Sequence, residues 1–473
     1  MEENKTQGEI LREKLFHKKE NGWEHTSEER KNEIYAYCDG YMDFMNRSKT
    51  EREIVESVKE MAEAKGFRDI QTVEKINPGD KVYYINKEKS MYLAVIGTKS
   101  MEEGLNIIGA HGDSPRLDLK PNPIYEDGGF AYFKTHYYGG NKKYQWTTIP
   151  LAFHGVIVKT NGEKIKVCIG EDKKDPIFTI TDLLPHLAQE QMDKKIRDAI
   201  PGENLNLLIG SIPFADSKVG EKVKLNILNI LNQKYGVTEK DFLSAEIELV
   251  PAFEARSLGI DGSMIAAYGQ DDKVCVYTAT TAILEMEKPE TTAICIISDK
   301  EEIGSMGNTG MESRVFDTFI SELLNKGEGN QPNRLEKVFC HSKMLSADVD
   351  AGFDPIYAQV SEKNNASFIG RGIGMNKYTG ARGKSGASDA NAEFVAEVRS
   401  IFEANDVAYQ IAELGKVDVG GGGTIAYILA NKGIDVIDCG VPVLSMHSPY
   451  EVTSKFDVYE AYRAYHAFYQ SKK

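Results

Sequence analysis

The stretch TAICIISDKEEIGSMG, residues 292–307, joins a short apolar run to two adjacent glutamates and a glycine-containing turn. An apolar run rich in isoleucine favours a buried strand, and the glycines favour a turn directly after it. Adjacent carboxylates repel each other, and charged side chains are mostly exposed to water. Glu301 and Glu302 therefore raise the question of which partners the rest of the chain supplies.

Three other apolar runs end in acidic residues or histidine. LNIIGAHGDSPRLD leads to His111 and Asp113, KMLSADVD leads to Asp348, and IDVIDCGVPVLSMHSPYE leads to His447. In open α/β sheets the carboxyl ends of the strands share one edge, where ligands bind. We therefore expect these side chains to converge although they are distant in sequence.

A further acidic pair, Asp271 and Asp272, follows a glycine at the start of a predicted helix in AAYGQDDKVCVYTATTAILEME. Imidazole and carboxylate ligands without thiolates suit catalytic zinc, cobalt or manganese. Two cations about 4 Å apart need a bridging carboxylate, and together they lower the pKa of a bound water. A second carboxylate that binds no metal must then accept the proton. One glutamate of the pair at 301–302 is thus predicted to bind metal and its neighbour to handle the proton.

Each of these residues also has an ordinary structural explanation. A single histidine such as His111 or His447 is often a hydrogen-bonded core residue, and Asp348 could cap a turn. Asp113 lies two residues after His111, on the same face of an extended strand, where it could orient the imidazole or form a simple salt bridge. Their joint placement favours the metal site.

Composition limits the classes of function. The chain has 473 residues, 27% of them charged, and a net charge of -15, which argues against binding to nucleic acid or anionic membranes. The N-terminal stretch MEENKTQGEILREK lacks the apolar region of a secretory signal, and no run approaches the roughly 18 apolar residues that span a bilayer. The six cysteines form no C-x-x-C pair and are expected to be reduced. A cytoplasmic protein is the simplest expectation.

The pattern along the chain indicates three zones. Residues 28–65 have the spacing of two amphipathic helices, and residues 120–245 are rich in strand signals, including an Asn161-Gly162 hairpin turn. After about residue 250, short apolar runs alternate with helical segments, as in an α/β sheet. Two glycine-rich segments, YTGARGKSG and VDVGGGGTIA, lack the spacing of nucleotide-binding motifs.

Five motifs in order, HGDSPRLDLKP, GQDDKVC, SDKEEIGSMG, SADVDAGFDPIY and MHSPYE, resemble the aspartyl aminopeptidase family of two-metal exopeptidases. The resemblance implies two divalent metal ions per subunit, expected to be zinc, with cobalt or manganese as alternatives. It implies as metal ligands His111, Asp271, Glu302, Asp348 and His447.

The same resemblance implies roles for the remaining site residues. Asp271 would bridge the metals, Glu301 would be the general base, and Asp113 would orient His111. Asp272 competes for the bridging role, because many relatives have asparagine after the aspartate. His186, in LLPHLAQE, resembles a family histidine that reaches the active site of a neighbouring subunit.

The implied fold is an α/β mixed-sheet catalytic domain with helices on both faces, interrupted by an inserted β-rich dimerisation domain. The expected boundaries are 1–120 and 249–473 for the catalytic domain and 121–248 for the insertion. The implied assembly is a homo-oligomer, a dodecameric tetrahedral shell built from dimers.

The expected function is removal of the N-terminal residue, with Asp or Glu suggested by the resemblance, from peptide substrates. Arg382 and Lys384 are the nearest basic candidates for holding an acidic side chain, and a solvated loop is their alternative role. Two other functions stay open at this point: a related two-metal carboxypeptidase or deacylase, and an inactive scaffold of the same fold.

Overall fold

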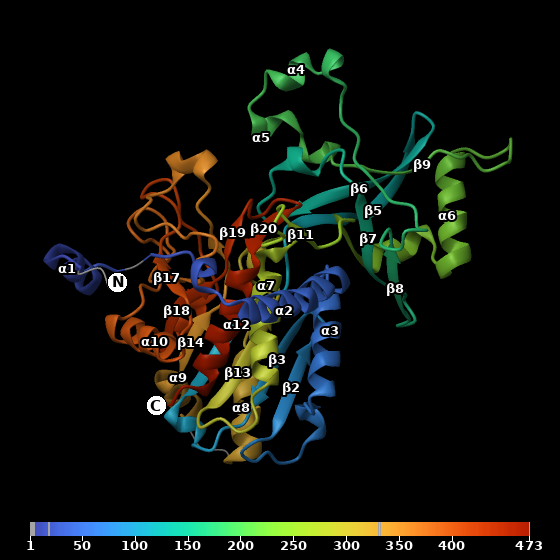
Figure 1. Cartoon of the computed structure of the whole chain (residues 1–473). Coiled ribbons are helices and arrows are strands. Elements are labelled where there is room, and N and C mark those ends of the chain that lie inside the picture. The colour runs from blue at the N-terminus through green and yellow to red at the C-terminus, as the bar shows by residue number, and fades with distance from the viewer. Residues whose placement is uncertain (1–4, 18, 330, 332, 473) are drawn as a thin grey trace.

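The computed structural model describes residues 5–472 except 18, 330 and 332. Residues 1–4 of the N-terminal stretch discussed above therefore lie outside the described part. Three sheets organise the chain, with helices packed around them (Figure 1). Within the described residues, no helix is both long enough and apolar enough to cross a membrane.

The largest sheet has nine strands in the order β1-β2-β3-β13-β4-β14-β18-β16-β17. Its four central strands, β13, β4, β14 and β18, are parallel, whereas β3 and β16 pair with this group in the antiparallel sense. This mixed sheet confirms the predicted fold class. The strands are β1 (Arg68–Asp69), β2 (Lys81–Asn86), β3 (Ser90–Val95), β4 (Leu105–His111), β13 (Thr292–Ser298), β14 (Lys343–Ser346), β16 (Ile373–Asn376), β17 (Tyr409–Ala412) and β18 (Asp435–Gly440).

Helices cover both faces of this sheet because its central strands are apolar on both sides. Along β13, Cys295 and Ile297 belong to one buried cluster, whereas Ile294 and Ile296 belong to the other, as the alternation of side chains in a strand requires. One cluster contains residues of α2 (Glu28–Arg47), α3 (Glu51–Ala64), α7 (Gln270–Leu284), α10 (Ala392–Ala404) and α12 (Lys455–Gln470). The opposite cluster contains residues of α8 (Val315–Gly327), α9 (Arg334–His341) and α11 (Ala426–Ala430).

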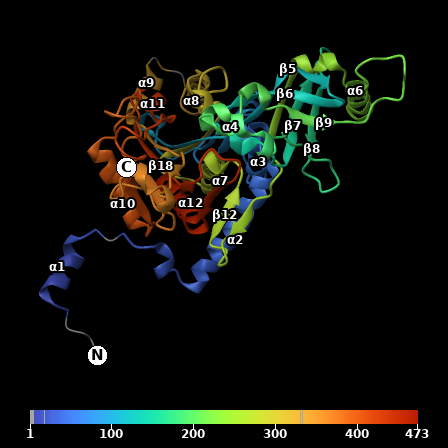
Figure 2. The same ribbon diagram turned by 90° about the horizontal axis from the view of Figure 1, so that it is seen from above.

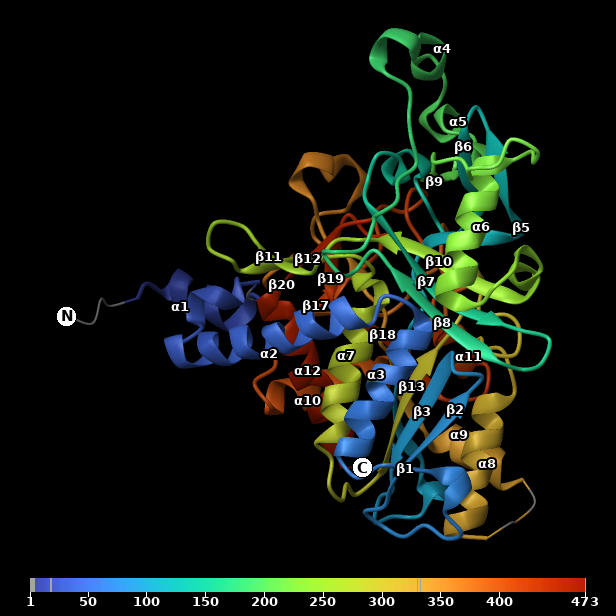
Figure 3. The ribbon, with the colours of Figure 1, turned by 90° about the vertical axis from the view of Figure 1, so that its right-hand side faces the viewer.

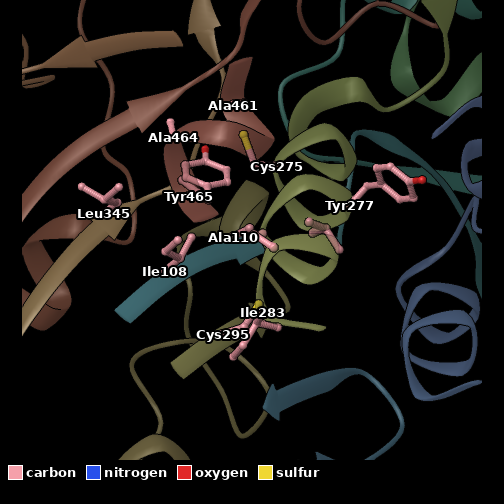
Figure 4. Packing of buried hydrophobic residues seen from close by; sticks show 14 of the residues in the cluster. Ile108, Ala110, Cys275, Tyr277, Ile283, Cys295, Leu345, Ala461, Ala464 and Tyr465 are labelled. Atoms are coloured by element: carbon pink, nitrogen blue, oxygen red, sulfur yellow. The ribbon is translucent and has the colours of Figure 1, made fainter. Parts of the chain in front are cut away.

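Figure 4 shows part of the first cluster, in which Ile108 and Ala110 of β4 lie with Cys275 of α7 and Tyr465 of α12. All four residues are buried. This packing fixes α7 against β4 and so determines where the N-terminus of α7 meets the sheet edge.

The two helices predicted between residues 28 and 65 are α2 and α3. Ser27 caps α2, and Thr50 and Glu53 form a capping box at the start of α3. Gly66, expected to mark the end of the second helix, follows α3 by two residues and has a φ of 84°, a conformation that favours glycine.

A six-stranded antiparallel sheet, in the order β8-β7-β10-β5-β6-β9, occupies most of the zone expected to be rich in strands. The Asn161-Gly162 turn joins β7 to β8, as predicted, and Gly162 has a φ of 87°. The same zone also contains helices, of which α6 packs along the sheet (Figure 3). The elements are β5 (Arg116–Asp127), β6 (Phe130–Tyr138), β7 (Leu151–Val158), β8 (Lys164–Ile169), β9 (Leu207–Gly210), β10 (Ala245–Pro251), α4 (Gln189–Met192), α5 (Ile196–Ala199) and α6 (Lys222–Tyr235).

The third sheet has five strands in the order β11-β12-β20-β19-β15. It corrects one expectation from the sequence. The apolar run before His447 is not one strand, because it divides into β18 of the nine-stranded sheet and β19 of the five-stranded sheet. The strands of the smaller sheet are β11 (Arg256–Leu258), β12 (Met264–Ala267), β15 (Asp350–Ala351), β19 (Pro442–Leu444) and β20 (Glu451–Ser454).

Two parts of the chain project from the main body. Helix α1 (Gln7–Leu15) extends away from the sheets and buries none of its residues (Figure 2). The segment that carries α4 and α5 extends beyond the six-stranded sheet (Figure 1). The site residues, by contrast, come from the places where the three sheets approach one another.

Candidate metal centre

The central strands of the nine-stranded sheet deliver four of the predicted site residues to one edge. His111 is the last residue of β4, and Asp348 follows the end of β14 by two residues. Glu301 and Glu302 begin a short 3₁₀ helix, Glu301–Ile303, directly after β13. Because β13, β4 and β14 are parallel neighbours, these ends lie side by side, as predicted from the sequence.

The five-stranded sheet supplies the remaining residues. Asp271 lies at the start of α7, just after β12, and a cis peptide bond joins it to Asp272. Gly269 precedes this turn with a φ of 69°, and a Cβ atom there would lie 2.7 Å from Ser114 Oγ. That hydroxyl donates to the Asp271 carbonyl at 2.8 Å, so the glycine allows the chain to close on the β4–β5 loop.

His447 lies in the loop between β19 and β20, opposite His111 across Asp271. His111 Nε2 is 3.3 Å from Asp271 Oδ1, and His447 Nε2 is 3.1 Å from Asp271 Oδ2. Each oxygen of the one carboxylate therefore faces a different imidazole.

Two groups of three potential ligands share Asp271. The first is His111, Asp271 and Asp348, and the second is Asp271, Glu302 and His447. Within each group the ligand atoms lie within 4.8 Å of one another. The structure thus brings all five predicted metal ligands together.

The electrostatics of the cluster reflect carboxylates packed out of water. Burial, together with Asp348 and Asp271, raises the pKa of Glu301 to about 8, and burial with Asp271 raises the pKa of Glu302 well above its usual value. Burial lowers the pKa of His447, but Asp271 and Glu302 outweigh it and raise that pKa to about 10. All three raised pKa values fit a buried site with an excess of negative charge, which bound cations would compensate.

The donor set fits divalent metal ions. Among the described residues, the buried atoms Asp271 Oδ1 and Glu302 Oε1 have no hydrogen-bond partner. Buried polar atoms are nearly always paired, so such oxygens favour a bound ion. Imidazole nitrogen and carboxylate oxygen are ligands that suit zinc.

Asp113 supports the site in two ways. His111 Nδ1 lies 3.0 Å from the Asp113 carbonyl oxygen and 3.5 Å from its Oδ1. The carboxylate also accepts the backbone N–H groups of Glu301 at 3.0 Å and Glu302 at 3.1 Å. Asp113 therefore holds in place the turn that carries Glu301 and Glu302. Its spacing from His111 in the sequence does not indicate these contacts.

Glu451 is a supporting residue that the sequence interpretation missed, although it closes the MHSPYE motif. It is buried, its Oε1 accepts the His447 N–H at 2.7 Å, and its Oε2 accepts the Asp271 N–H at 3.1 Å. Glu451 thus fixes the backbone of two residues that belong to the same ligand group.

The six-stranded sheet also reaches the centre. The Tyr138 hydroxyl at the end of β6 donates to Asp113 Oδ2 at 2.9 Å. A Cβ atom at Gly140 would lie 2.7 Å from His447 Nδ1, so the loop after β6 packs closely against this histidine. No spacing or periodicity in the sequence predicts these contacts.

Two other predicted residues lie outside both groups of ligands. Asp272 accepts the His111 N–H through Oδ2 at 3.3 Å, and burial raises its pKa well above the usual value. His186 is exposed on the short 3₁₀ helix Pro185–Leu187, in the segment before α4, and within the described residues no hydrogen bond or ion pair joins it to the cluster. The structure of one chain therefore does not bring His186 to the site.

A mixed α/β fold that gathers two histidines and several buried carboxylates at one site is typical of metal-dependent hydrolases. A family model described as aminopeptidase I zinc metalloprotease (M18) matches residues 44–469. The chain belongs to this M18 family of zinc aminopeptidases, which is the family that its motifs resemble.

Individual relatives agree over nearly the whole chain. A Clostridium acetobutylicum protein named "Probable M18 family aminopeptidase 1" is 50% identical over 458 residues, which cover 96% of this chain and 98% of the relative. The crystal structure of an M18 aminopeptidase from Thermotoga maritima, 45% identical, superposes with a TM-score of 0.92 and covers 97% of this chain and 100% of that one. The aminopeptidase I structure from Clostridium acetobutylicum, 48% identical over the same shares, has a TM-score of 0.91.

The protein is therefore a metal-dependent aminopeptidase, and the carboxypeptidase, deacylase and inactive-scaffold alternatives are set aside.

We expect replacement of Glu451 by glutamine to weaken metal binding by about 10- to 100-fold, the usual effect of losing a group that orients a ligand. The amide can accept from only one of the two backbone N–H groups that Glu451 holds. Metal affinity is measured by competition with a chromophoric chelator.

The matched control is Asp457→Asn, because Asp457 is also buried and accepts two backbone N–H groups, from Gly370 and Gly372. Equal metal affinities for Glu451→Gln and the wild-type protein would contradict this role of Glu451.

Proposed function

We propose that the enzyme works with two divalent cations bridged by Asp271. The observation that carries this proposal is the position of Asp271 in both ligand groups, with its two oxygens 3.3 and 3.1 Å from different imidazoles. His111 and Asp348 would complete one metal site, and Glu302 and His447 the other. The cations would polarise the peptide carbonyl and lower the pKa of a water.

Glu301 would act as the general base and then as the general acid. It lies outside both ligand groups, and 15% of its side chain is exposed, whereas only 4% of the Glu302 side chain is exposed. Glu301 would take a proton from water as the water oxygen bonds to the carbonyl carbon. It would then give the proton to the leaving nitrogen as the C–N bond breaks.

The substrates would be peptides with a free α-amine. The site's carboxylates offer charge-assisted contacts to an ammonium group, worth about 1.5–3 kcal/mol each. The resemblance to aspartyl aminopeptidases supports a preference for Asp or Glu as the first residue. The basic candidate Lys384 contacts Asp389 at 3.1 Å and lies over the Tyr378 ring, so its own surroundings do not add to this support.

The active form would be a homo-oligomer in which residues 121–248, which carry most of the six-stranded sheet, form the dimerisation domain. The projecting segment of this domain exposes large apolar side chains, including Leu187 at 70% and Met192 at 71%. Exposed apolar patches of this kind mark interaction surfaces. A yeast relative of the same fold, mApe1, has a structure described as a dodecamer, which supports a dodecamer here.

His186 would contribute to catalysis in such an assembly. It lies between the exposed residues Leu184 and Leu187, so an interface that covers these leucines would also bring His186 against a neighbouring subunit. This placement supports a role in the neighbour's active site.

A cytoplasmic location also forms part of the proposal. The six cysteines are free thiols, and four of them are buried. Disulfides form and persist in oxidising compartments, so free thiols support a reducing one.

We expect the two adjacent glutamates to differ in their effects. Glu301→Gln should retain both metals and lose about 10²- to 10⁴-fold in kcat, because the amide cannot accept the proton. Glu302→Gln should lose metal from the site that it shares with His447. Metal analysis and kinetics of the two purified variants check this, and the reverse pattern would exchange the two roles.

N-terminal acetylation of a peptide should reduce its cleavage at least tenfold, because it removes the charge-assisted contact of the amine. Free and acetylated peptides that begin with Asp or Leu form the test set. Equal cleavage of free and acetylated forms would contradict the proposed amine recognition. Faster cleavage of the Leu peptide would contradict only the acidic preference.

Light scattering at micromolar concentration should give a mass well above the 52.7 kDa of one chain. Leu187→Asp combined with Met192→Asp should lower this mass, since charge is placed in the exposed apolar segment. Lys173→Asp, an exposed position in the same domain outside that segment, is the control. A wild-type mass of one chain would refute the assembly.

A further inference from the structure

We propose that Glu53, His154 and Cys168 form a separate binding site for one divalent transition-metal ion, with zinc as the best match. We call these three residues the Cys168 site. Glu53 belongs to α3, His154 to β7 and Cys168 to β8. The site therefore lies where α3, which packs on the nine-stranded sheet, meets the six-stranded sheet. Their ligand atoms lie within 4.8 Å of one another.

The pairing of β7 with β8 creates the core of this site. His154 and Cys168 are direct cross-strand partners, so their side chains lie on the same face of the sheet. Cys168 Sγ is 3.9 Å from His154 Nδ1. Zinc–sulfur and zinc–nitrogen bonds of about 2.3 and 2.0–2.1 Å place tetrahedral ligand atoms at a similar separation.

Glu53 is held so that one oxygen faces this pair. Its Oε2 accepts the backbone N–H groups of Lys49 at 3.1 Å and Thr50 at 3.2 Å, at the start of α3. Its Oε1 lies 2.8 Å from His154 Nδ1. The helix cap therefore orients the carboxylate and leaves Oε1 directed toward the histidine and cysteine.

The other ring nitrogen of His154 has the partner that a metal-binding histidine requires. His154 Nε2 lies 2.9 Å from Glu171 Oε1, and the Lys49 ammonium holds Glu171 at 2.7 Å. A carboxylate on the far nitrogen orients the ring, so that Nδ1 could bind a metal once the proton that it shares with Glu53 has left. His154 is buried, whereas Cys168 is exposed, so an ion has access from solvent.

Charge is balanced with and without the ion. Burial lowers the pKa of His154, but its contacts with Cys168, Glu171 and Glu53 outweigh burial and raise that pKa well above its usual value. Without metal, protonated His154 and Lys49 therefore balance Glu53 and Glu171. A divalent cation would replace two protons, one from His154 Nδ1 and one from the Cys168 thiol, so the net charge would not change.

Lys234 is one nearby cation that opposes metal binding, because its charge acts on Cys168. Lys166 is another, because its charge acts on both Glu53 and Cys168. It forms an ion pair with Glu56, which reduces this opposition. Since two protons leave as the metal enters, affinity should rise with pH.

The cysteine ligand distinguishes this site from the aminopeptidase centre, whose two ligand groups contain only histidine and carboxylates. One thiolate, one imidazole and one carboxylate suit zinc and leave a fourth position for water. An ion there would link α3, which packs on the nine-stranded sheet, to strands β7 and β8 of the six-stranded sheet.

Cobalt provides the direct test, because a thiolate-to-cobalt charge-transfer band reports only a site that contains cysteine. Chelator-stripped enzyme reloaded with Co²⁺ should show this band, and Cys168→Ser should lose it together with one cobalt per chain. Cys340→Ser is the matched control, since Cys340 is also exposed. It should keep the band. Absence of the band from the fully loaded wild-type enzyme, or its persistence in Cys168→Ser, would overturn the proposal.

Thiol alkylation provides a second readout on the unmodified protein. Zinc added to stripped enzyme should slow iodoacetamide labelling of Cys168 at least tenfold relative to Cys340 in the same sample, as followed by peptide mass spectrometry. His154→Gln should abolish this protection. Equal labelling of Cys168 with and without zinc would refute the site even if the aminopeptidase centre binds its metals as proposed.

Discussion

The repulsion among carboxylates packed around Asp271 is the constraint on which the rest of the structure depends. Burial raises the pKa of Glu301, Glu302 and Asp348, so keeping them ionised together requires positive charge. Asp271 differs from them: burial raises its pKa, but the imidazoles of His111 and His447, which face its two oxygens, outweigh burial and lower it. A carboxylate held ionised between two histidines is suited to bridge two cations, and its neighbours are suited to complete their coordination.

Three sheets contribute to holding this arrangement rigid. The nine-stranded sheet aligns the ends of β4, β13 and β14, and the five-stranded sheet brings Asp271 and His447 against them. Two carboxylates then hold the backbone around the site. Asp113 accepts the N–H groups of Glu301 and Glu302, and Glu451 accepts those of Asp271 and His447. Through Tyr138, the six-stranded sheet contacts Asp113 directly, so this sheet supports the centre as well as the proposed assembly.

Much of this arrangement could be predicted from the sequence, because apolar runs that end in acids or histidine identify parallel strands and their shared edge. The pattern could not show that the run before His447 divides between two sheets, since an apolar run does not reveal which strand it pairs with. Glu451 escaped prediction because its role consists of contacts to backbone amides, which leave no periodic signal. The proposed role of His186 depends on a second subunit, which one chain cannot display.

The central claim is that Asp271 joins two metal sites, and anomalous diffraction from crystals of the zinc-loaded enzyme tests it most directly. The account predicts two zinc peaks about 3.5–4 Å apart, one on each side of the Asp271 carboxylate. One peak should contact His111 and Asp348, and the other Glu302 and His447. A single peak in this region, or two peaks bridged by Asp272 instead of Asp271, would contradict the account.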